Sequence, residues 1–248
     1  MLDSKILFPY KTLREGQDSF INEVLNAIKT KTNLMVHAPT GIGKTVAVLA
    51  PALRYAIDNN LTIFFLTSRH TQHKIVIDTL KEIKKVHNEN FLVADFIGKK
   101  NMCSVEGISD LGTRDFHDYC NDVVEKNLCN FFNNSKSKKL LNKRENLIGE
   151  ISNINPLHVE EIVNLSKDRD FCGFEITCEI AKNANIIIAD YFHVLNDGIR
   201  DGLFFKINKS LERSIVIFDE SHNLPDRCRD LMTENLSSNT IDYAKKEA

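Results

Sequence analysis

The chain has 248 residues, of which 42% are hydrophobic and 27% are charged, and it contains six cysteines. This length allows one sizeable core with an insertion or two small domains, and the net charge of −2 excludes attraction to nucleic acid through overall charge, so such binding needs a local patch. Charged residues near the start argue against a signal peptide, and no apolar run approaches the roughly 20 residues of a membrane helix, so we expect a soluble cytoplasmic protein (nuclear in a eukaryote) that contacts no membrane.

Apolar runs and helical patterns alternate along the chain. Apolar side chains over 17–30 fall on one helical face, and a longer amphipathic helix is predicted over 70–86. Strands are predicted over 33–38, 61–67, 91–98, 185–190 and 214–220. Because these strands are apolar throughout and alternate with helices, they predict an α/β fold with a parallel sheet covered on both faces.

The stretch from residue 98 to about residue 181 has a different character. It is polar, rich in Asn and Lys, lacks a strong strand signal and holds five of the six cysteines. Roughly eighty residues are too many for a connection between two strands, so they predict an inserted subdomain. Its basic run at 135–144 is either a solvated helix face or a DNA contact.

A glycine-rich loop reads APTGIGKT at residues 38–45. It fits the phosphate-binding pattern G-x-x-x-x-G-K-[ST] with alanine in the first place. Gly41 and Gly43 allow backbone N–H groups to face phosphate oxygens. Lys44 suits the β- and γ-phosphates, and the hydroxyl of Thr45 suits Mg²⁺. The predicted ATP-binding residues of this loop are Ala38, Pro39, Thr40, Gly41, Ile42, Gly43, Lys44 and Thr45.

Two carboxylates end the last predicted strand, in IVIFDESH at 215–222. In phosphoryl transfer, Asp219 would hold Mg²⁺ and Glu220 would orient and deprotonate the attacking water. The simpler alternative is a helix cap formed by Asp219 or Ser221. Combined with the glycine-rich loop, the pair predicts an ATP hydrolase with Lys44, Asp219 and Glu220 as its catalytic residues.

The DESH sequence resembles the DEAH box of superfamily 2 helicases, with serine in place of alanine. The resemblance implies that His222 couples the state of the γ-phosphate to the DNA-binding surface. FPYKTLREGQ at 8–17 resembles the adenine-recognising motif of the same family, which implies that Gln17 contacts the base. From sequence alone, Phe8 and Tyr10 are equally well explained as core aromatics.

Four cysteines of the insertion stand at wide intervals. They are Cys103, Cys120, Cys129 and Cys172. Their spacing contains no C-x-x-C pair, so the local signature of a zinc site is missing. From spacing alone, four buried thiols are the simpler interpretation.

Three segments around these cysteines resemble, in the same order, the XPD-type iron–sulfur helicases, a group that includes DinG and FANCJ-like enzymes. The segments are 98–103, 170–195 and 219–242. The resemblance implies that the four cysteines bind a [4Fe–4S] cluster, with Cys103 as the first ligand and Cys172 as the last. It also implies that Cys178 and Cys228 are buried thiols outside the cluster.

Contacts to single-stranded DNA are implied for TSRHTQ at 67–72, where Arg69 and Thr71 are the candidates, and for Lys99 and Lys100 before the first cysteine. A helix cap with a surface arginine is the alternative for the first of these. Three residues after a predicted strand either stack on bases or pack against the insertion: Tyr191, Phe192 and His193.

The resemblance predicts a RecA-like P-loop motor domain with a parallel sheet, carrying a mainly helical iron–sulfur insertion. The motor domain would comprise 1–98 and 182–222, the insertion 99–181, and the start of a helical arch domain 223–248. The implied function is an ATP-dependent DNA helicase that moves 5′ to 3′ on single-stranded DNA or a forked duplex, in DNA repair. Its implied cofactors are the cluster and Mg²⁺, with ATP as substrate.

Members of the family continue into a second motor domain that supplies an arginine finger. We therefore expect slow ATP hydrolysis by this chain alone, with a second chain as one source of the missing half. Two other functions fit the same motifs. One is an adaptor that binds ATP and nucleic acid without motor activity, and the other is a P-loop ATPase with a zinc-stabilised insertion.

Overall fold

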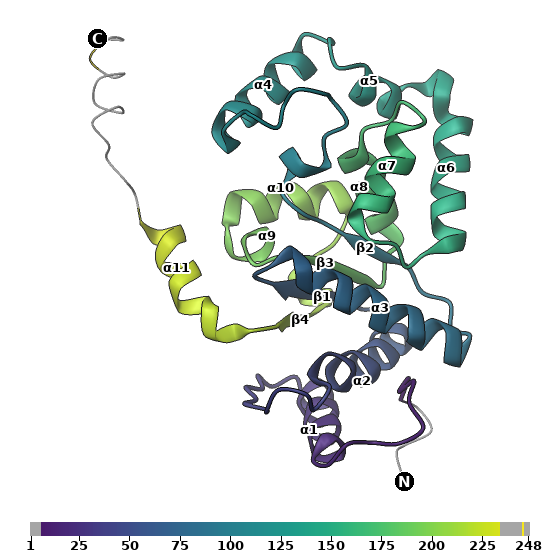
Figure 1. Ribbon diagram of the computed structural model, residues 1–248, viewed down its shortest axis with the longest axis vertical. Helices are drawn as coiled ribbons and strands as arrows, with labels where there is room; N and C mark the ends of the chain where they lie inside the picture. Colours follow the sequence, from purple (N-terminus) through teal and green to yellow (C-terminus); the bar gives the residue numbers. More distant parts are fainter. Residues whose placement is uncertain (1–5, 234–244, 246–248) are drawn as a thin grey trace.

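A computed structural model describes residues 6–233 and residue 245, and its centre is a four-stranded sheet with helices on both faces (Figure 1). The strands are β1 Thr62–Thr67, β2 Val93–Asp95, β3 Ile186–Asp190 and β4 Ser214–Phe218. They are parallel and stand in the order β2-β3-β1-β4. The predicted α/β fold with a parallel sheet is therefore confirmed.

Helices connect the strands and form most of the insertion. Around the sheet lie α1 Gln17–Thr30, α2 Lys44–Asn59, α3 His70–His87, α8 Gly173–Asn183, α9 Phe192–Leu195, α10 Asp197–Ile207 and α11 Leu224–Met232. Between β2 and α8 lie α4 Thr113–Glu125, α5 Asn130–Lys136, α6 Leu141–Ile154 and α7 Val159–Lys167. Short 3₁₀ turns are η1 Lys99–Met102, η2 Lys138–Leu140, η3 Leu211–Arg213 and η4 Ser221–Asn223. Of the helices in these described ranges, none is long and apolar enough to cross a membrane.

Strand β1 is buried along its whole length because both faces of the sheet are covered. Successive side chains of a strand point to opposite faces. Ile63 and Phe65 join the cluster formed with α2 and α3, while Phe64 and Leu66 join the cluster on the other face. This explains why the strand has no polar alternation.

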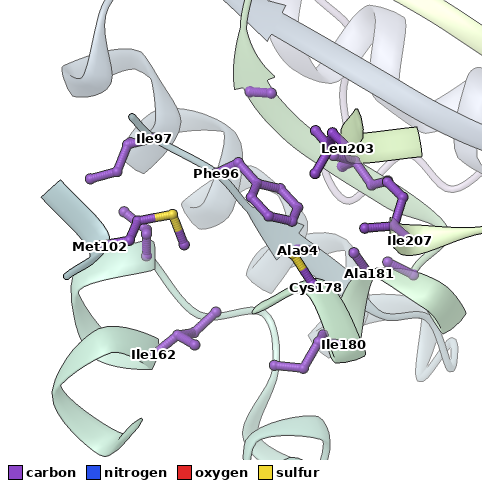
Figure 2. Packing of buried hydrophobic residues seen from close by; sticks show 14 of the residues in the cluster. Ala94, Phe96, Ile97, Met102, Ile162, Cys178, Ile180, Ala181, Leu203 and Ile207 are labelled. Carbon is purple, nitrogen blue, oxygen red and sulfur yellow. The ribbon is translucent and has the colours of Figure 1, made fainter. Parts of the chain in front are cut away.

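The predicted insertion shares its core with the sheet. Met102, Ile162 and Cys178 belong to one apolar cluster with Phe96, directly after β2, and Leu203 of α10 (Figure 2). The predicted helical character of the insertion is confirmed, because its described residues form helices and turns. The domain boundaries at 98, 181 and 222 stay predictions, and residues 234–244 and 246–248 of the predicted arch lie outside the described residues.

The insertion also completes the outer edge of the sheet. The side chain of Asn155 accepts a hydrogen bond from the N–H of Val93 and donates one to its carbonyl, each at 2.8 Å. These are the bonds that a neighbouring strand would otherwise give to an exposed edge. One buried amide side chain therefore closes the edge of β2.

The predicted strand at 33–38 is wrong. Residues 32–39 form no regular element, and Met35 exposes 93% of its surface. The chain leaves α1 through Lys31 in the left-handed conformation (φ 55°), with the N–H of Thr32 bonded to Ala27, and lies beside α1 and α2 (Figure 1). Apolar content alone does not specify a pairing partner, and within the described residues the second edge of β4 pairs with no strand.

Replacing Asn155 with alanine should lower the free energy of unfolding by about 2–4 kcal/mol. Two buried backbone groups of Val93 lose their partner, and each unsatisfied group costs about 1–3 kcal/mol. Urea denaturation measures the change. Asn153→Ala, two residues away and exposed, is the matched control and should change stability by less than about 0.5 kcal/mol. Equal effects of the two variants would contradict the role of Asn155 at the sheet edge.

Candidate functional site

A cavity of about 260 Å³ opens between the glycine-rich loop, the first turns of α3 and the acid pair after β4. It is lined by Arg14, Gly41, Gly43, Lys44, Thr45, Gln72, Ile75, Asp219 and Glu220. The loop at the start of α2 and the acid pair are far apart in the sequence. The fold brings them together at the carboxyl ends of parallel strands, where α/β sheets commonly bind ligands.

Two glycines give the loop its shape. Gly41 and Gly43 have φ angles of 87° and 83°, which lie in the left-handed region that favours glycine. A Cβ atom on Gly43 would lie 2.8 Å from Nε2 of Gln17, so the site also lacks room for a side chain. Arg14 donates a hydrogen bond from its guanidinium to the carbonyl of Gly41. Both predicted glycines therefore stand where the backbone needs them.

Gln17 is buried and holds the loop from behind. Its Nε2 donates to the carbonyl of Ile42 at 2.9 Å, and its Oε1 accepts from the N–H of Arg14 at 3.1 Å. Among the remaining loop residues, the carbonyl of Ala38 accepts from Nζ of Lys44 at 3.4 Å, and Pro39 and Thr40 are exposed. The predicted contact between Gln17 and the base stays a prediction.

The acid pair combines burial with backbone strain. The N–H of Asp219 bonds to the carbonyl of Leu66 at 2.9 Å, which extends the pairing of β1 and β4 by one residue. Burial raises the pKa of the Asp219 carboxyl, and the charge of Glu220 acts in the same direction, while Lys44 opposes both. Glu220 has a φ angle of 54°, a conformation that costs a side-chain-bearing residue about 1–3 kcal/mol and is concentrated at functional sites.

His222 points to solvent beside the acid pair. Its side chain is 73% exposed, and its Nδ1 lies 3.3 Å from Oε2 of Glu220. This position is compatible with sensing the state of Glu220. The predicted coupling of His222 to a DNA surface is tested by no contact in the structure and stays a prediction.

The predicted DNA contacts differ in their surroundings. Arg69 and Thr71 are exposed where α3 begins. Lys99 places its Nζ 5.7 Å from the centre of the Phe174 ring, and Lys100 donates to the carbonyl of Ser109 at 2.9 Å. The first pair is presented to solvent, whereas the lysines pack within the insertion.

Three polar residues near the cavity were missed from the sequence, and the role of a fourth, Tyr191, was left open. The missed residues are Ser68, Gln72 and Asn223. Tyr191 has no exposed surface, so base stacking is wrong for it and packing is right. Its hydroxyl donates to the carbonyl of Asp219, and Nδ2 of Asn223 lies 3.3 Å from Oγ of Ser68. Single polar residues inside apolar or helical patterns carry no sequence signal of their own.

The four insertion cysteines lie on neighbouring segments and are each partly exposed. Burial raises the pKa of the Cys103 thiol, and the thiols of Cys120 and Cys129 add to the effect. Burial also raises the pKa of Cys172 to about 11, and its neighbours Glu175 and Cys103 act in the same direction. Cys103 is thus influenced electrostatically by Cys120 and Cys129 and itself influences Cys172.

The backbone brings the first and last of these cysteines together at Gly173. A Cβ atom there would lie 2.9 Å from the carbonyl of Met102, so only glycine allows this approach. A hollow of about 210 Å³ beside Cys129 is lined mainly by apolar residues of the same segments. Even so, no three potential ligands among residues 6–233 and 245 stand close enough to hold one metal ion.

The other two cysteines differ from each other. Cys178 is 1% exposed within the shared core, and burial raises its pKa to about 12, so its assignment as a buried thiol is confirmed (Figure 2). Cys228 on α11 is partly exposed, so the same assignment is wrong for it. Helix α11, which carries Cys228, contains no buried residue, so it offers no core position for this thiol.

The parallel sheet, the glycine-rich loop and the acid pair define a RecA-like P-loop nucleotide-binding domain. A solved XPD helicase structure matches 96% of this chain and 38% of its own chain, with a TM-score of 0.63 and 20% sequence identity, which supports the same fold. The DEAD_2 family matches residues 65–241, and the family described as DEAD/DEAH box helicase matches residues 14–111. The chain belongs to the DEAD_2 family and is a superfamily 2 helicase domain of the XPD type.

Named relatives agree with this assignment. The chain is 26% identical to the regulator of telomere elongation helicase 1 homolog of Arabidopsis thaliana, over 97% of this chain and 25% of the relative. It is 23% identical to the general transcription and DNA repair factor IIH helicase subunit XPD of the same plant, over 98% of this chain and 34% of the relative. The chain thus spans about a quarter to a third of the length of these relatives.

As the pH is lowered, magnesium-dependent nucleotide binding should weaken. The weakening should begin at a higher pH than it would if the pKa of Asp219 were that of an ordinary aspartate. The raised pKa of Asp219 means that this carboxyl binds a proton, and loses its attraction for the cation, while ordinary carboxyls are still ionised. Titration of Mg²⁺ into the nucleotide complex at several pH values measures the effect.

Asp219→Asn should lower the apparent Mg²⁺ affinity by about 10–100-fold and remove its pH dependence. Asp226→Asn, an exposed carboxyl of α11, is the matched control and should leave both unchanged. If the Asp219→Asn chain kept the pH dependence of the unchanged protein, another group would be responsible.

Proposed function

We propose that this chain forms the ATP-binding motor part of an ATP-dependent DNA helicase, with ATP as the substrate. The observation that carries the proposal is the single cavity that unites Lys44 and Thr45 with Asp219 and Glu220. A phosphate-binding lysine beside a strand-end acid pair has the parts that phosphoryl transfer to water requires.

The residues of the cavity suit hydrolysis of the γ-phosphate. Thr45 and Asp219 supply the oxygen donors that Mg²⁺ prefers and line the same cavity, so the site fits this ion. Bound Mg²⁺ would neutralise charge on the β- and γ-phosphate oxygens. Lys44 binds these phosphates. Glu220 accepts a proton from the attacking water while the water oxygen bonds to the γ-phosphorus. The bond between the γ-phosphorus and the bridging oxygen breaks, which releases ADP.

Single-stranded DNA, alone or at a forked duplex, is the proposed track. Arg69 and Thr71 combine a guanidinium, a hydroxyl and the start of α3, which together suit phosphate contact. Lys99 and Lys100 would extend the contact toward the insertion, and His222 would couple it to the γ-phosphate. Movement 5′ to 3′ and a place in DNA repair follow from resemblance to the XPD group, and the name of one relative includes DNA repair.

The second motor domain is proposed from the part of the relatives that this chain does not match. Its arginine finger would complete the ATP site, whether it comes from the same polypeptide or from a second chain. Related phosphoryl transfers gain about 10³–10⁵ in rate from such an arginine. In the proposed division, 1–98 and 182–222 are the motor, 99–181 the insertion and 223–248 the start of the arch.

A [4Fe–4S] cluster is the proposed group of the insertion. Its four candidate ligands, Cys103, Cys120, Cys129 and Cys172, are thiols, which is the donor class that such clusters use. Their segments are neighbours, as the close contact at Gly173 and the mutual effects on thiol pKa indicate. A bound cluster would cross-link the strand-poor insertion, so that it could stand as one body beside the DNA path.

The proposed function predicts that MgATP changes the affinity of the chain for single-stranded DNA. Fluorescence anisotropy of a labelled oligothymidylate, with and without a non-hydrolysable ATP analogue, measures both affinities. Lys44→Ala should weaken nucleotide binding by about 30-fold or more, because the proposed charge contact with the phosphates is lost. Lys29→Ala, an exposed lysine of α1, should not.

Arg69→Ala should weaken binding of the oligonucleotide whatever its base sequence. It should also reduce, by about one, the slope of log affinity against log salt concentration. An adaptor without motor activity would bind both ligands without any effect of one on the other. A chain that binds ATP but no oligonucleotide would contradict the DNA part of the proposal.

Iron, acid-labile sulfide and zinc contents of anaerobically purified protein test the cluster. About four irons and four sulfides per chain are expected. Cys172→Ser should lose them, and Cys228→Ser on α11 should keep them. One zinc without sulfide would favour the ATPase with a zinc-stabilised insertion and would remove the iron–sulfur assignment.

A further inference from the structure

A run of hydrogen bonds joins the backbone of the acid pair to the segment that follows β1, which we call the 68–73 segment. Tyr191 bonds to the carbonyl of Asp219, and Asn223 bonds both to the carbonyl of Glu220 and to Ser68. We propose that Ser68, Tyr191 and Asn223 are positioning residues that transmit the state of the nucleotide cavity to the 68–73 segment. The inference rests on the proposed function and names a route that does not pass through His222.

Tyr191 forms the end of the run nearest to the nucleotide. It follows β3, has no exposed surface and donates its hydroxyl proton to the carbonyl of Asp219. Its ring packs edge-on against Phe218, with centroids 5.7 Å apart. Burial raises the pKa of Tyr191 to about 12, and the charges of Asp219 and Glu220 act in the same direction. The phenol therefore stays protonated and remains a hydrogen-bond donor at neutral pH.

Asn223 closes the run on the other side of the acid pair. Its Nδ2 lies 3.3 Å from Oγ of Ser68 and 3.1 Å from the carbonyl of Glu220. Its backbone N–H bonds to the same carbonyl at 3.0 Å. Asn223 therefore ties Ser68 to the backbone of Glu220, and the nearby Ser68 hydroxyl lowers the pKa of the Tyr191 phenol.

The chemistry of the end groups fixes the direction of every bond. An amide nitrogen only donates and a backbone carbonyl only accepts. The Nδ2 group of Asn223 therefore donates to Ser68 and to the carbonyl of Glu220, and the hydroxyl of Tyr191 donates to the carbonyl of Asp219. The two side chains thus hold the two adjacent carbonyls of the acid pair, and Asn223 links that backbone to Ser68. Loss of the Tyr191 hydroxyl should loosen the acid pair, and loss of the Ser68 hydroxyl should detach the 68–73 segment from it.

The run is placed where the nucleotide would act on it. Asp219 lines the cavity, and its N–H is bonded to Leu66, two residues before Ser68. Beyond Ser68, the carbonyl of Arg69 accepts from Oγ1 of Thr67 at 3.1 Å. A shift of the acid pair on binding or loss of the γ-phosphate would move Ser68 and, through the backbone, the exposed Arg69.

His222 provides a contrasting geometry. Its recorded polar contact is with Glu220 at 3.3 Å, and its side chain is 73% exposed. It can respond to Glu220, but among the described residues it forms no hydrogen bond or ion pair with the 68–73 segment. The route through Asn223 is the one that bonds both to the acid pair and to Ser68.

The experiment measures the ratio of oligothymidylate dissociation constants without and with a non-hydrolysable ATP analogue and Mg²⁺, using the full chain. Tyr191→Phe removes only the hydroxyl, and Ser68→Ala removes the next one. In each variant this ratio should move toward one, by a factor of about three to ten. That is the size of effect expected from the loss of one hydrogen bond in the coupling route. The affinity for the analogue alone should change less than about threefold.

Controls separate coupling from general damage. Tyr55→Phe changes a tyrosine of α2 outside the run and should give the same ratio as the unchanged chain. Ser68→Thr retains the hydroxyl and should also give that ratio, in contrast to Ser68→Ala. The double variant Tyr191→Phe/Ser68→Ala should lose less than the sum of the two single variants, since both act through the backbone of the acid pair. By linkage, the effect of the oligonucleotide on analogue affinity should fall by the same factor.

Three results would overturn the inference. The ratio could stay unchanged in Tyr191→Phe and Ser68→Ala while His222→Ala removes it, which would assign coupling to the histidine. The unchanged chain could bind both ligands independently, which would leave ATP and DNA binding standing and remove the route. A failure of the unchanged chain to bind the analogue would overturn the proposed function itself.

Discussion

The buried carboxylate of Asp95 is the group on which the arrangement of the sheet and the predicted insertion depends. It ends β2, has no exposed surface, and accepts hydrogen bonds from Nδ1 of His73 at 2.5 Å and from the N–H of Val159 at 2.9 Å, with Nε2 of His158 at 3.8 Å. An unpartnered buried carboxylate would be very costly. These partners belong to α3 and to the start of α7, so the requirement fixes both elements against the sheet edge.

A second buried carboxylate holds the insertion from the other side. Glu175, in the first turn of α8, lies between Lys136 of α5 and Lys206 of α10. Burial alone would raise the pKa of Glu175, but the two lysines outweigh it and lower the pKa. Since Lys136 belongs to the predicted insertion and Lys206 lies outside it, this ion group joins the two, and removal of either lysine would leave part of a buried charge uncompensated.

Sequence patterns predicted what depends on composition and periodicity, but not what depends on pairing. The strands at 62–67 and 186–190 were predictable because burial on both faces demands an unbroken apolar run. The run at 33–38 has the same composition and is not in the sheet, because no pattern specifies its ladder partner. The glycine-rich loop and acid pair were predictable from chemistry, whereas the bond between Tyr191 and Asp219 joins residues whose contact only the fold creates.

The 68–73 segment runs from the nucleotide cavity toward the predicted insertion, and it is held by hydrogen bonds at both ends. Ser68 is bonded on the side of the nucleotide cavity, and His73 is bonded to Asp95 on the side of the insertion. Between these anchors, Arg69 and Thr71 are exposed. Because Arg69 lies between two anchored residues, Ser68 and His73, a displacement of Ser68 would change how Arg69 is presented to solvent. The same geometry makes the relation reciprocal, since a strand bound at Arg69 would bias Ser68 and the carbonyl of Asp219.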